Sequence, residues 1–148
     1  MTSETIAATL NSLIETCKDG QEGFRVAASD VKNAELKTLF SEFSLQRSQF
    51  VGELQTLVRT LGEDMEKTSS VAGAVHRGWI NLKAAVSSGD EHSVLSECER
   101  GEDHAVAEYR KALAAELPAN ARETVQRQAT QVQAAHDRVR DLRDALKK

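Results

Sequence analysis

The stretch that decides the fold runs from Asn33 to Gly62 and reads NAELKTLFSEFSLQRSQFVGELQTLVRTLG. Its apolar residues recur every three or four positions, which is the spacing of one face of an amphipathic helix. Asn33 is a preferred N-cap residue, and Gly62 is a typical C-terminal stop. A helix of this length, about 45 Å, is typical of a helical bundle. Its predicted inward face consists of Leu36, Leu39, Phe40, Phe43, Arg47, Phe50, Leu54, Leu57, Val58 and Leu61.

Four further helical patterns flank this stretch, three of them long and one short. Gly20 and Gly23 weaken the first of them by about 1 kcal/mol each relative to alanine, but its apolar pattern continues across both. Pro118 ends the third long helix and leaves a tight connection to the last one. The long patterns span residues 3–31, 92–116 and 121–146, and the short one spans residues 70–88.

The order of these helices predicts the topology. Two helices joined tightly, a long crossover, and two more helices joined tightly are the connectivity of a ferritin-like four-helix bundle. An aromatic content of 4% and a single proline also favour an all-helical domain. We therefore predict an all-α fold with one domain over residues 1–148. It consists of two antiparallel helix pairs, with a short helix in the crossover between the second and third long helices.

Charge and cysteine usage narrow the setting of the protein. A net charge of −4 argues against nucleic-acid binding. No apolar run is long enough to span a membrane, and the first residues lack the pattern of a signal peptide. Cys17 and Cys98 show no C-x-x-C spacing, and both fall on apolar faces, so we expect buried free thiols. These features favour a cytoplasmic protein.

Polar residues interrupt the apolar faces of the long helices. Arg47, Glu102 and His136 each fall inside a predicted inward face, and Cys17 lies at a comparable position in the first helix. A buried charge without a partner costs several kcal/mol, on the order of the stability of a whole domain. These residues are therefore predicted to meet one another in a buried polar centre.

Several short motifs carry a family resemblance. They are Gly101-Glu102-Asp103-His104-Ala105, His76-Arg77-Gly78-Trp79, the run from Lys18 to Phe24, and His136-Asp137. Together they resemble a bacterial ferritin-like family known only as a four-helix-bundle domain of unknown function. The resemblance covers nearly the whole chain. It implies the ferritin-like fold and no established activity.

The wider ferritin-like superfamily holds two iron or manganese ions with a Glu from each of two helices and a Glu-x-x-His from each of the other two. On this chain Glu102 matches one carboxylate. Gln133 and His136 have the Glu-x-x-His spacing with a neutral amide in place of the acid, while Ser44 and Arg47 have neither ligand. Because a guanidinium repels cations and is always charged, we predict that Arg47 occupies the metal position. It would pair with Glu102, with His136 and Gln133 completing the hydrogen bonds.

Two classes of function stay open at this point. The first is non-enzymatic: a structural, interaction or small-ligand-binding bundle with a degenerate metal centre and no cofactor. The second is an iron- or manganese-binding protein or oxidase with a reduced ligand set, in which Glu102 and His136 bind the ion with help from Asp103 or Glu22. Redox sensing through the two cysteines is a weaker third reading, because buried thiols are unreactive.

The surface offers two recognition hypotheses. His76, Arg77 and Trp79 could form a patch on the crossover, although Trp79 could instead pack over the bundle. The last helix is basic, with seven Lys/Arg against four Asp/Glu over residues 119–148, and could contact an acidic surface in a homodimer or an unknown protein partner. Glu97, Glu99 and Asp103 read as a solvated acidic face.

Overall fold

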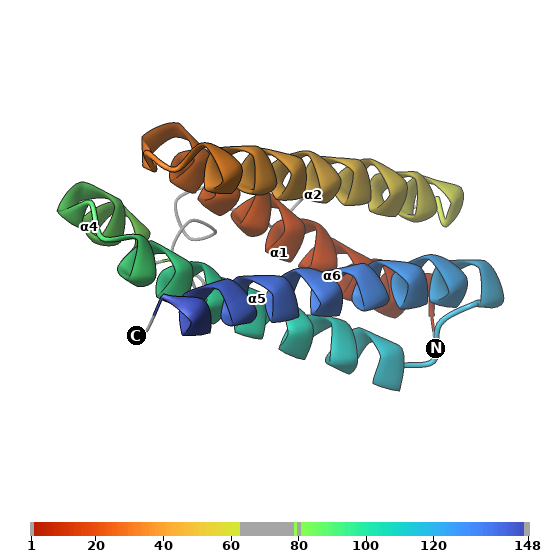
Figure 1. Cartoon of the computed structure of the whole chain (residues 1–148). Coiled ribbons are helices and arrows are strands. Elements are labelled where there is room, and N and C mark those ends of the chain that lie inside the picture. Colours follow the sequence, from red (N-terminus) through yellow and green to blue (C-terminus); the bar gives the residue numbers. More distant parts are fainter. Residues whose placement is uncertain (1, 63–78, 80, 147–148) are drawn as a thin grey trace.

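The computed structural model describes residues 2–62, 79 and 81–146, and in this part of the chain the secondary structure is entirely helical. Figure 1 shows two long helical hairpins lying against each other, with a short helix at one end. The elements are α1 (Ser3–Asp30), α2 (Ala34–Thr60), α4 (Leu82–Ser88), α5 (Glu91–Ala114) and α6 (Ala119–Ala145).

Local sequence signals set the helix ends. The side chains of Thr2, Asn33 and Asp90 accept hydrogen bonds from backbone N–H groups in the first turns of α1, α2 and α5, respectively. These N–H groups have no partner within the helix, so the caps stabilise the helix starts. Helix α4 ends at Gly89, whose φ of 73° is a left-handed conformation that glycine adopts without strain. Pro118 precedes the first residue of α6, where its fixed φ is compatible with helix initiation.

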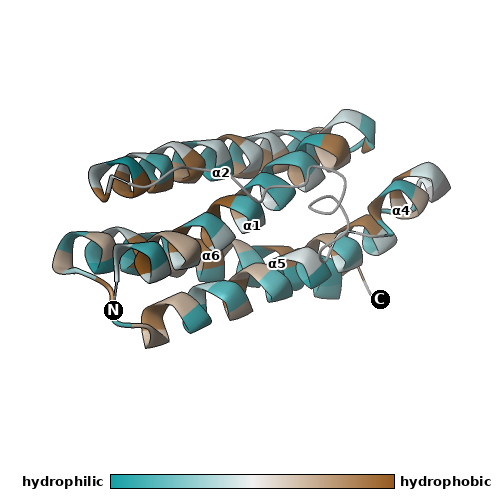
Figure 2. Cartoon of the chain, turned by 180° about the vertical axis from the view of Figure 1, so that it is seen from behind, coloured by the Kyte–Doolittle hydropathy of each residue, from teal (hydrophilic) through white to brown (hydrophobic). Residues whose placement is uncertain are grey.

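The two hairpins pack through α1 and α5. Helix α1 lies against α2 and α5, helix α5 lies against α6, and α4 covers one end of α1 and α5 (Figure 1). Hydrophobic and hydrophilic residues alternate along each long helix, as Figure 2 shows from the other side. Each helix therefore buries one face and exposes the other. Within the described ranges, no helix combines the length and the apolar character that crossing a membrane would require.

The buried residues form two apolar clusters. One includes Leu10, Leu54 and Tyr109, and the other includes Phe24, Phe40 and Leu95. Along α1, α2 and α5, a buried polar residue falls between the two clusters: Asp19, Arg47 and Glu102. In α2, for example, Phe40 belongs to one cluster, Phe50 belongs to the other, and Arg47 lies between them.

Four of the five predicted helices agree with the structure to within two residues at each end. The short helix differs, because the described helix α4 begins at Leu82 and Trp79 lies in a turn before it. The remaining residues predicted for the start of this helix, 70–78, lie outside the described part of the chain. Helix α1 is continuous through Gly20 and Gly23, as predicted.

Candidate functional site

A buried ion pair occupies the centre of the bundle. The Arg47 guanidinium on α2 donates two hydrogen bonds to the Glu102 carboxylate on α5, from Nη1 to Oε1 and from Nη2 to Oε2, both at 2.5 Å. Arg47 is 1% exposed and Glu102 is 0% exposed. The predicted pairing of these two side chains is therefore present. The bidentate geometry satisfies both carboxylate oxygens at once.

The walls around Arg47 fit a planar cation. Its guanidinium carbon lies 5.5 Å from the centroid of the Phe24 ring, a cation–π distance. A Cβ at Gly20 would lie 3.0 Å from Arg47 Nη1, so the glycine on α1 leaves the room that the guanidinium occupies. Burial by itself would lower the pKa of Arg47, but attraction and hydrogen bonding from Glu102 outweigh it and raise that pKa. Arg47 is therefore a fixed positive charge.

A second polar chain adjoins this pair. The Tyr109 hydroxyl donates to Gln128 Oε1 at 2.6 Å and lies 3.0 Å from the Cys17 thiol, which is left as the donor in that contact. Gln128 Nε2 donates in turn to Glu53 Oε1 at 2.8 Å. Burial raises the pKa of Cys17 to about 11 and raises that of Tyr109 well above its ordinary value. Both groups are therefore protonated near neutral pH.

Cys98, the second cysteine, is also buried and free, on the inner face of α5. Burial raises the pKa of its thiol well above the ordinary value. Since the thiolate is the reactive form, neither Cys98 nor Cys17 has the character of a redox-sensing thiol.

The predicted positions of His136 and Gln133 are wrong. Among the described residues, Gln133 bonds to Asp137 and His136 bonds to Asp103, and neither bonds to Arg47 or Glu102. Both side chains are only partly buried on the flank of α6. The buried residues of α6 follow a regular spacing of four and three: Ala121, Val125, Gln128, Val132, Ala135 and Val139. The predicted inward face shares Val125, Val132 and Val139 with this pattern but takes Ala129 and His136 where the structure buries Gln128 and Ala135. Helix α6 therefore places Gln128, and not Gln133, in the interior.

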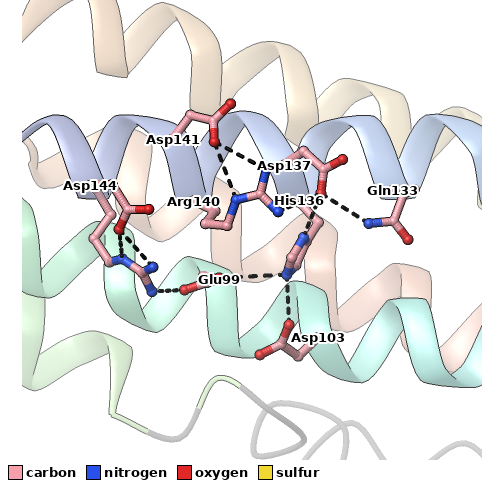
Figure 3. Close-up of polar contacts among 9 residues, drawn as sticks. Glu99, Asp103, Gln133, His136, Asp137, Arg140, Asp141 and Asp144 are labelled. Atoms are coloured by element: carbon pink, nitrogen blue, oxygen red, sulfur yellow. Dashed lines mark hydrogen bonds and ion pairs between the residues drawn. The ribbon is translucent and has the colours of Figure 1, made fainter.

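His136 instead joins a cluster between α5 and α6, shown in Figure 3. Its Nε2 lies 2.7 Å from Asp103 Oδ1 and 3.7 Å from Glu99 Oε2, and its Nδ1 lies 3.0 Å from Asp137 Oδ1. Among the described residues, Glu99, Asp103 and His136 are the group whose ligand atoms could hold a metal ion, and these atoms all lie within 4.8 Å of one another. Glu102 is not part of this group.

This arrangement corrects the predicted ligand set of Glu102 and His136. Both oxygens of Glu102 are taken by Arg47, and His136 faces different carboxylates. The residues at the bundle centre do not fit the two metal ions of the ferritin-like superfamily, which four carboxylates and two histidines would bind. The centre holds instead the permanent positive charge of Arg47 and one carboxylate, Glu102, which Arg47 neutralises. Ser44, at another ligand position, donates its hydroxyl hydrogen to the Gln21 carbonyl instead.

Trp79 is buried, at 6% exposed, and this corrects its proposed place in a surface patch. Its indole is wedged between α1 and α5, where a Cβ added at Gly23 or Gly101 would approach it to 2.4 Å or 2.1 Å. The other two residues of the patch, His76 and Arg77, lie outside the described residues. The acidic face is also corrected in part, because Glu97 is buried and accepts a hydrogen bond from the backbone N–H of Asn81 at 2.9 Å.

A family model described as a domain of unknown function (DUF2383) matches residues 5–115, which is most of the chain. The match includes α1, α2, α4, α5 and both members of the buried ion pair. The chain therefore belongs to this family. No curated protein matches it.

Proposed function

We propose that this member of the DUF2383 family is a non-catalytic ferritin-like four-helix bundle that acts as an interaction domain. The observation that carries the proposal is the bidentate Arg47–Glu102 contact at the bundle centre. It puts a permanent positive charge where a ferritin-like metal centre would need carboxylates. The two hairpins, joined by a long crossover, support the ferritin-like topology.

Iron or manganese chemistry at this centre would need a different set of side chains. Glu102 is the carboxylate of the pair, and Arg47 neutralises it. Removing Arg47 alone would leave a buried, unpaired carboxylate. An Arg47→Glu variant would instead present two carboxylates on facing helices, which is the beginning of a ferritin-like ligand set.

The experiment is a titration of Fe(II) and Mn(II) into the purified chain and the Arg47→Glu variant. Both proteins should also carry His136→Gln, which disables the separate surface cluster. We expect no stoichiometric binding when Arg47 is present and measurable binding when Glu replaces it. Binding in the Arg47 protein that disappears in Glu102→Gln would place a metal at the centre and overturn the proposal.

The interaction surface that we propose is the edge between α2 and α6. A cavity of about 540 Å³ opens there between the beginning of α2, the beginning of α5 and the end of α6, with Leu36, Leu39 and Leu142 in its lining. Two large apolar side chains are exposed along the same edge, Leu45 at 61% and Leu146 at 46%. Exposed apolar groups beside a cavity are typical of a protein contact surface.

The charges along this edge favour a second copy of the chain as the partner. The α2 side carries Glu35 and Glu42, and the α6 side carries Arg138. Arg127 of α6 already pairs with Glu53 of α2 at 2.8 Å. Two copies related by a two-fold axis would place the acidic side of each against the basic side of the other. Such a dimer would also cover the apolar side chains. The buried free thiols of Cys17 and Cys98 are consistent with a cytoplasmic setting.

Sedimentation equilibrium of the full chain tests this contact. We expect a dimer for the wild type and a monomer for Arg138→Glu, which turns two attractions per dimer into repulsions. The matched control is Arg122→Glu, because Arg122 donates to the backbone carbonyls of Leu113 and Ala115 at the end of α5, away from this edge. A wild type that stays monomeric, or a dimer indifferent to Arg138→Glu, would reject this surface.

A further inference from the structure

The α5–α6 seam brings one imidazole nitrogen and two carboxylates to a common point. Glu99 and Asp103 lie one turn apart on α5, and His136 reaches them from α6 (Figure 3). We propose that Glu99, Asp103 and His136 bind a single divalent transition-metal ion, with Zn²⁺ as the best match. This site is separate from the Arg47–Glu102 pair, and it goes beyond the proposed function of the bundle.

The surroundings of His136 prepare its Nε2 to act as a ligand. Nδ1 lies 3.0 Å from Asp137 Oδ1, which also accepts hydrogen bonds from Gln133 at 3.0 Å and Arg140 at 3.4 Å. Asp137 Oδ1 is therefore placed to accept the Nδ1 hydrogen, which leaves Nε2 to face the proposed ion. A histidine that donates its other ring N–H to a carboxylate is the usual arrangement in metal sites.

Glu99 is oriented in a similar way. Its Oε1 accepts a hydrogen bond from Arg143, and Arg143 Nη2 also donates to Asp144 Oδ1 at 2.8 Å. The other oxygen of Glu99, Oε2, faces His136. One oxygen is therefore fixed by the protein, and the other faces the proposed ion. The third ligand, Asp103, has a side chain that is 65% exposed. It leaves a path for the ion and room for water as a further ligand.

The distances suit a small ion. Zinc binds nitrogen and oxygen at about 2.0–2.2 Å in a tetrahedral site, so neighbouring ligand atoms lie about 3.4 Å apart. The separation of 3.7 Å from His136 Nε2 to Glu99 Oε2 is close to this value. The separation of 2.7 Å to Asp103 Oδ1 must widen, which an exposed aspartate can accommodate by rotation of its side chain.

Ligand type favours Zn²⁺ over Ca²⁺ or Mg²⁺. The imidazole nitrogen of His136 favours transition metals, whereas Ca²⁺ and Mg²⁺ prefer oxygen ligands. Because the ligands come from two helices, the ion would cross-link α5 to α6. Three protein ligands leave a coordination position open to water or to another molecule.

The test is a calorimetric titration of Zn²⁺ into the chelator-treated full chain, with the visible absorption of bound Co²⁺ as a second readout. We expect one ion per chain. His136→Gln and Asp103→Asn should each weaken binding by at least about tenfold, since each removes a direct ligand. Two controls should bind as the wild type does. They are Glu123→Gln, an exposed carboxylate near the start of α6, and His104→Gln, a histidine next to Asp103 in sequence.

Several outcomes would overturn the site. One is the absence of stoichiometric Zn²⁺ binding to the chelator-treated wild type. Another is binding that neither His136→Gln nor Asp103→Asn weakens. The Arg47→Met/Glu102→Leu double variant separates the two metal positions, because it should keep Zn²⁺ binding if it keeps its helical circular dichroism. Loss of binding in that folded variant would place the ion at the bundle centre.

Discussion

Glu99 and Glu102 lie three residues apart on α5, and their carboxylates occupy very different environments. Glu102 points into the bundle, is completely buried and gives both oxygens to Arg47. Glu99 lies on the seam with α6, where Arg143 and His136 contact it and its side chain is 14% exposed. One side chain is part of a closed ion pair, and the other is part of an open cluster. Burial, and not residue type, separates a structural carboxylate from a potential ligand.

Because the Arg47–Glu102 pair is fully buried, we expect the loss of one partner to change the free energy of unfolding more than any of the other substitutions. Glu102→Leu leaves the Arg47 guanidinium buried without a partner, and we expect it to lower the free energy of unfolding by about 3–5 kcal/mol. The Arg47→Met/Glu102→Leu double variant removes both charges and should lie within about 1 kcal/mol of the wild type or above it. Urea denaturation measures both. Equal losses in the single and double variants would show that packing, and not the lone charge, is responsible.

The buried thiol of Cys17 makes the stability of the bundle depend on pH in the alkaline range. Burial raises the pKa of Cys17 from its ordinary 9.0 to about 11, so in that interval the folded chain keeps a proton that the unfolded chain releases. The contribution to stability is complete below pH 9 and is lost as pH rises to about 11. It amounts to up to about 3 kcal/mol. Stability profiles of wild type and Cys17→Ala over this range measure it. A wild-type profile parallel to that of Cys17→Ala would contradict the prediction.

Gly101 tests how closely the buried side of α5 is packed. An alanine Cβ there would lie 2.1 Å from Trp79, so Gly101→Ala must displace the indole or the helix. We expect a loss of about 1–3 kcal/mol in the free energy of unfolding. Gly52→Ala is the matched control, because a Cβ at this helical glycine of α2 meets no atom within 4 Å. That control should gain about 0.5–1 kcal/mol from reduced backbone entropy. If chemical denaturation gave the same change in the free energy of unfolding for both substitutions, Trp79 would not be packed tightly against Gly101.

The open cluster should give the smallest effect in the absence of metal. His136→Gln removes partly solvated ion pairs, and we expect a change below about 1 kcal/mol. Added zinc should then separate the two proteins. At a free concentration about 100 times its dissociation constant, the ion should stabilise the wild type by about 2.7 kcal/mol. Thermal unfolding with and without Zn²⁺ measures the difference, and an equal shift in His136→Gln would argue against the site.

The sequence predicted the parts that depend on local patterns. The repeat of apolar residues in three- and four-residue steps predicted the four long helices, and Asn33 marked the start of one of them. The placement of Arg47 and Glu102 on inward faces predicted their pairing. In these cases the pattern within one helix is sufficient, because a charge on an apolar face has few alternatives to a partner across the core.

The candidate metal cluster could not be predicted in the same way. The apolar positions of α6 are sparse, and faces based on Gln128 or on Ala129 fit the sequence almost equally well. Whether Ala135 or His136 shares the inward face with Val132 and Val139 decides whether His136 lies near Glu102 or near Glu99. The spacing of Val125, Val132, Ala135 and Val139 in the sequence was the available signal, because a residue at position 128 continues it. This interpretation places the polar amide of Gln128 on an inward face, where an apolar residue such as Ala129 would normally be expected.

The sequence by itself determined the helical fold, the approximate helix ends and the presence of a buried charge pair. These follow from backbone capping, from the helical period and from the cost of an unpaired charge in a core. Only the tertiary structure decided the rotation of α6, the wedge of Trp79 between two glycines and the grouping of Glu99, Asp103 and His136. The reason is physical: a repeat along one helix fixes which residues share a face, but packing against the neighbouring helices fixes where that face points.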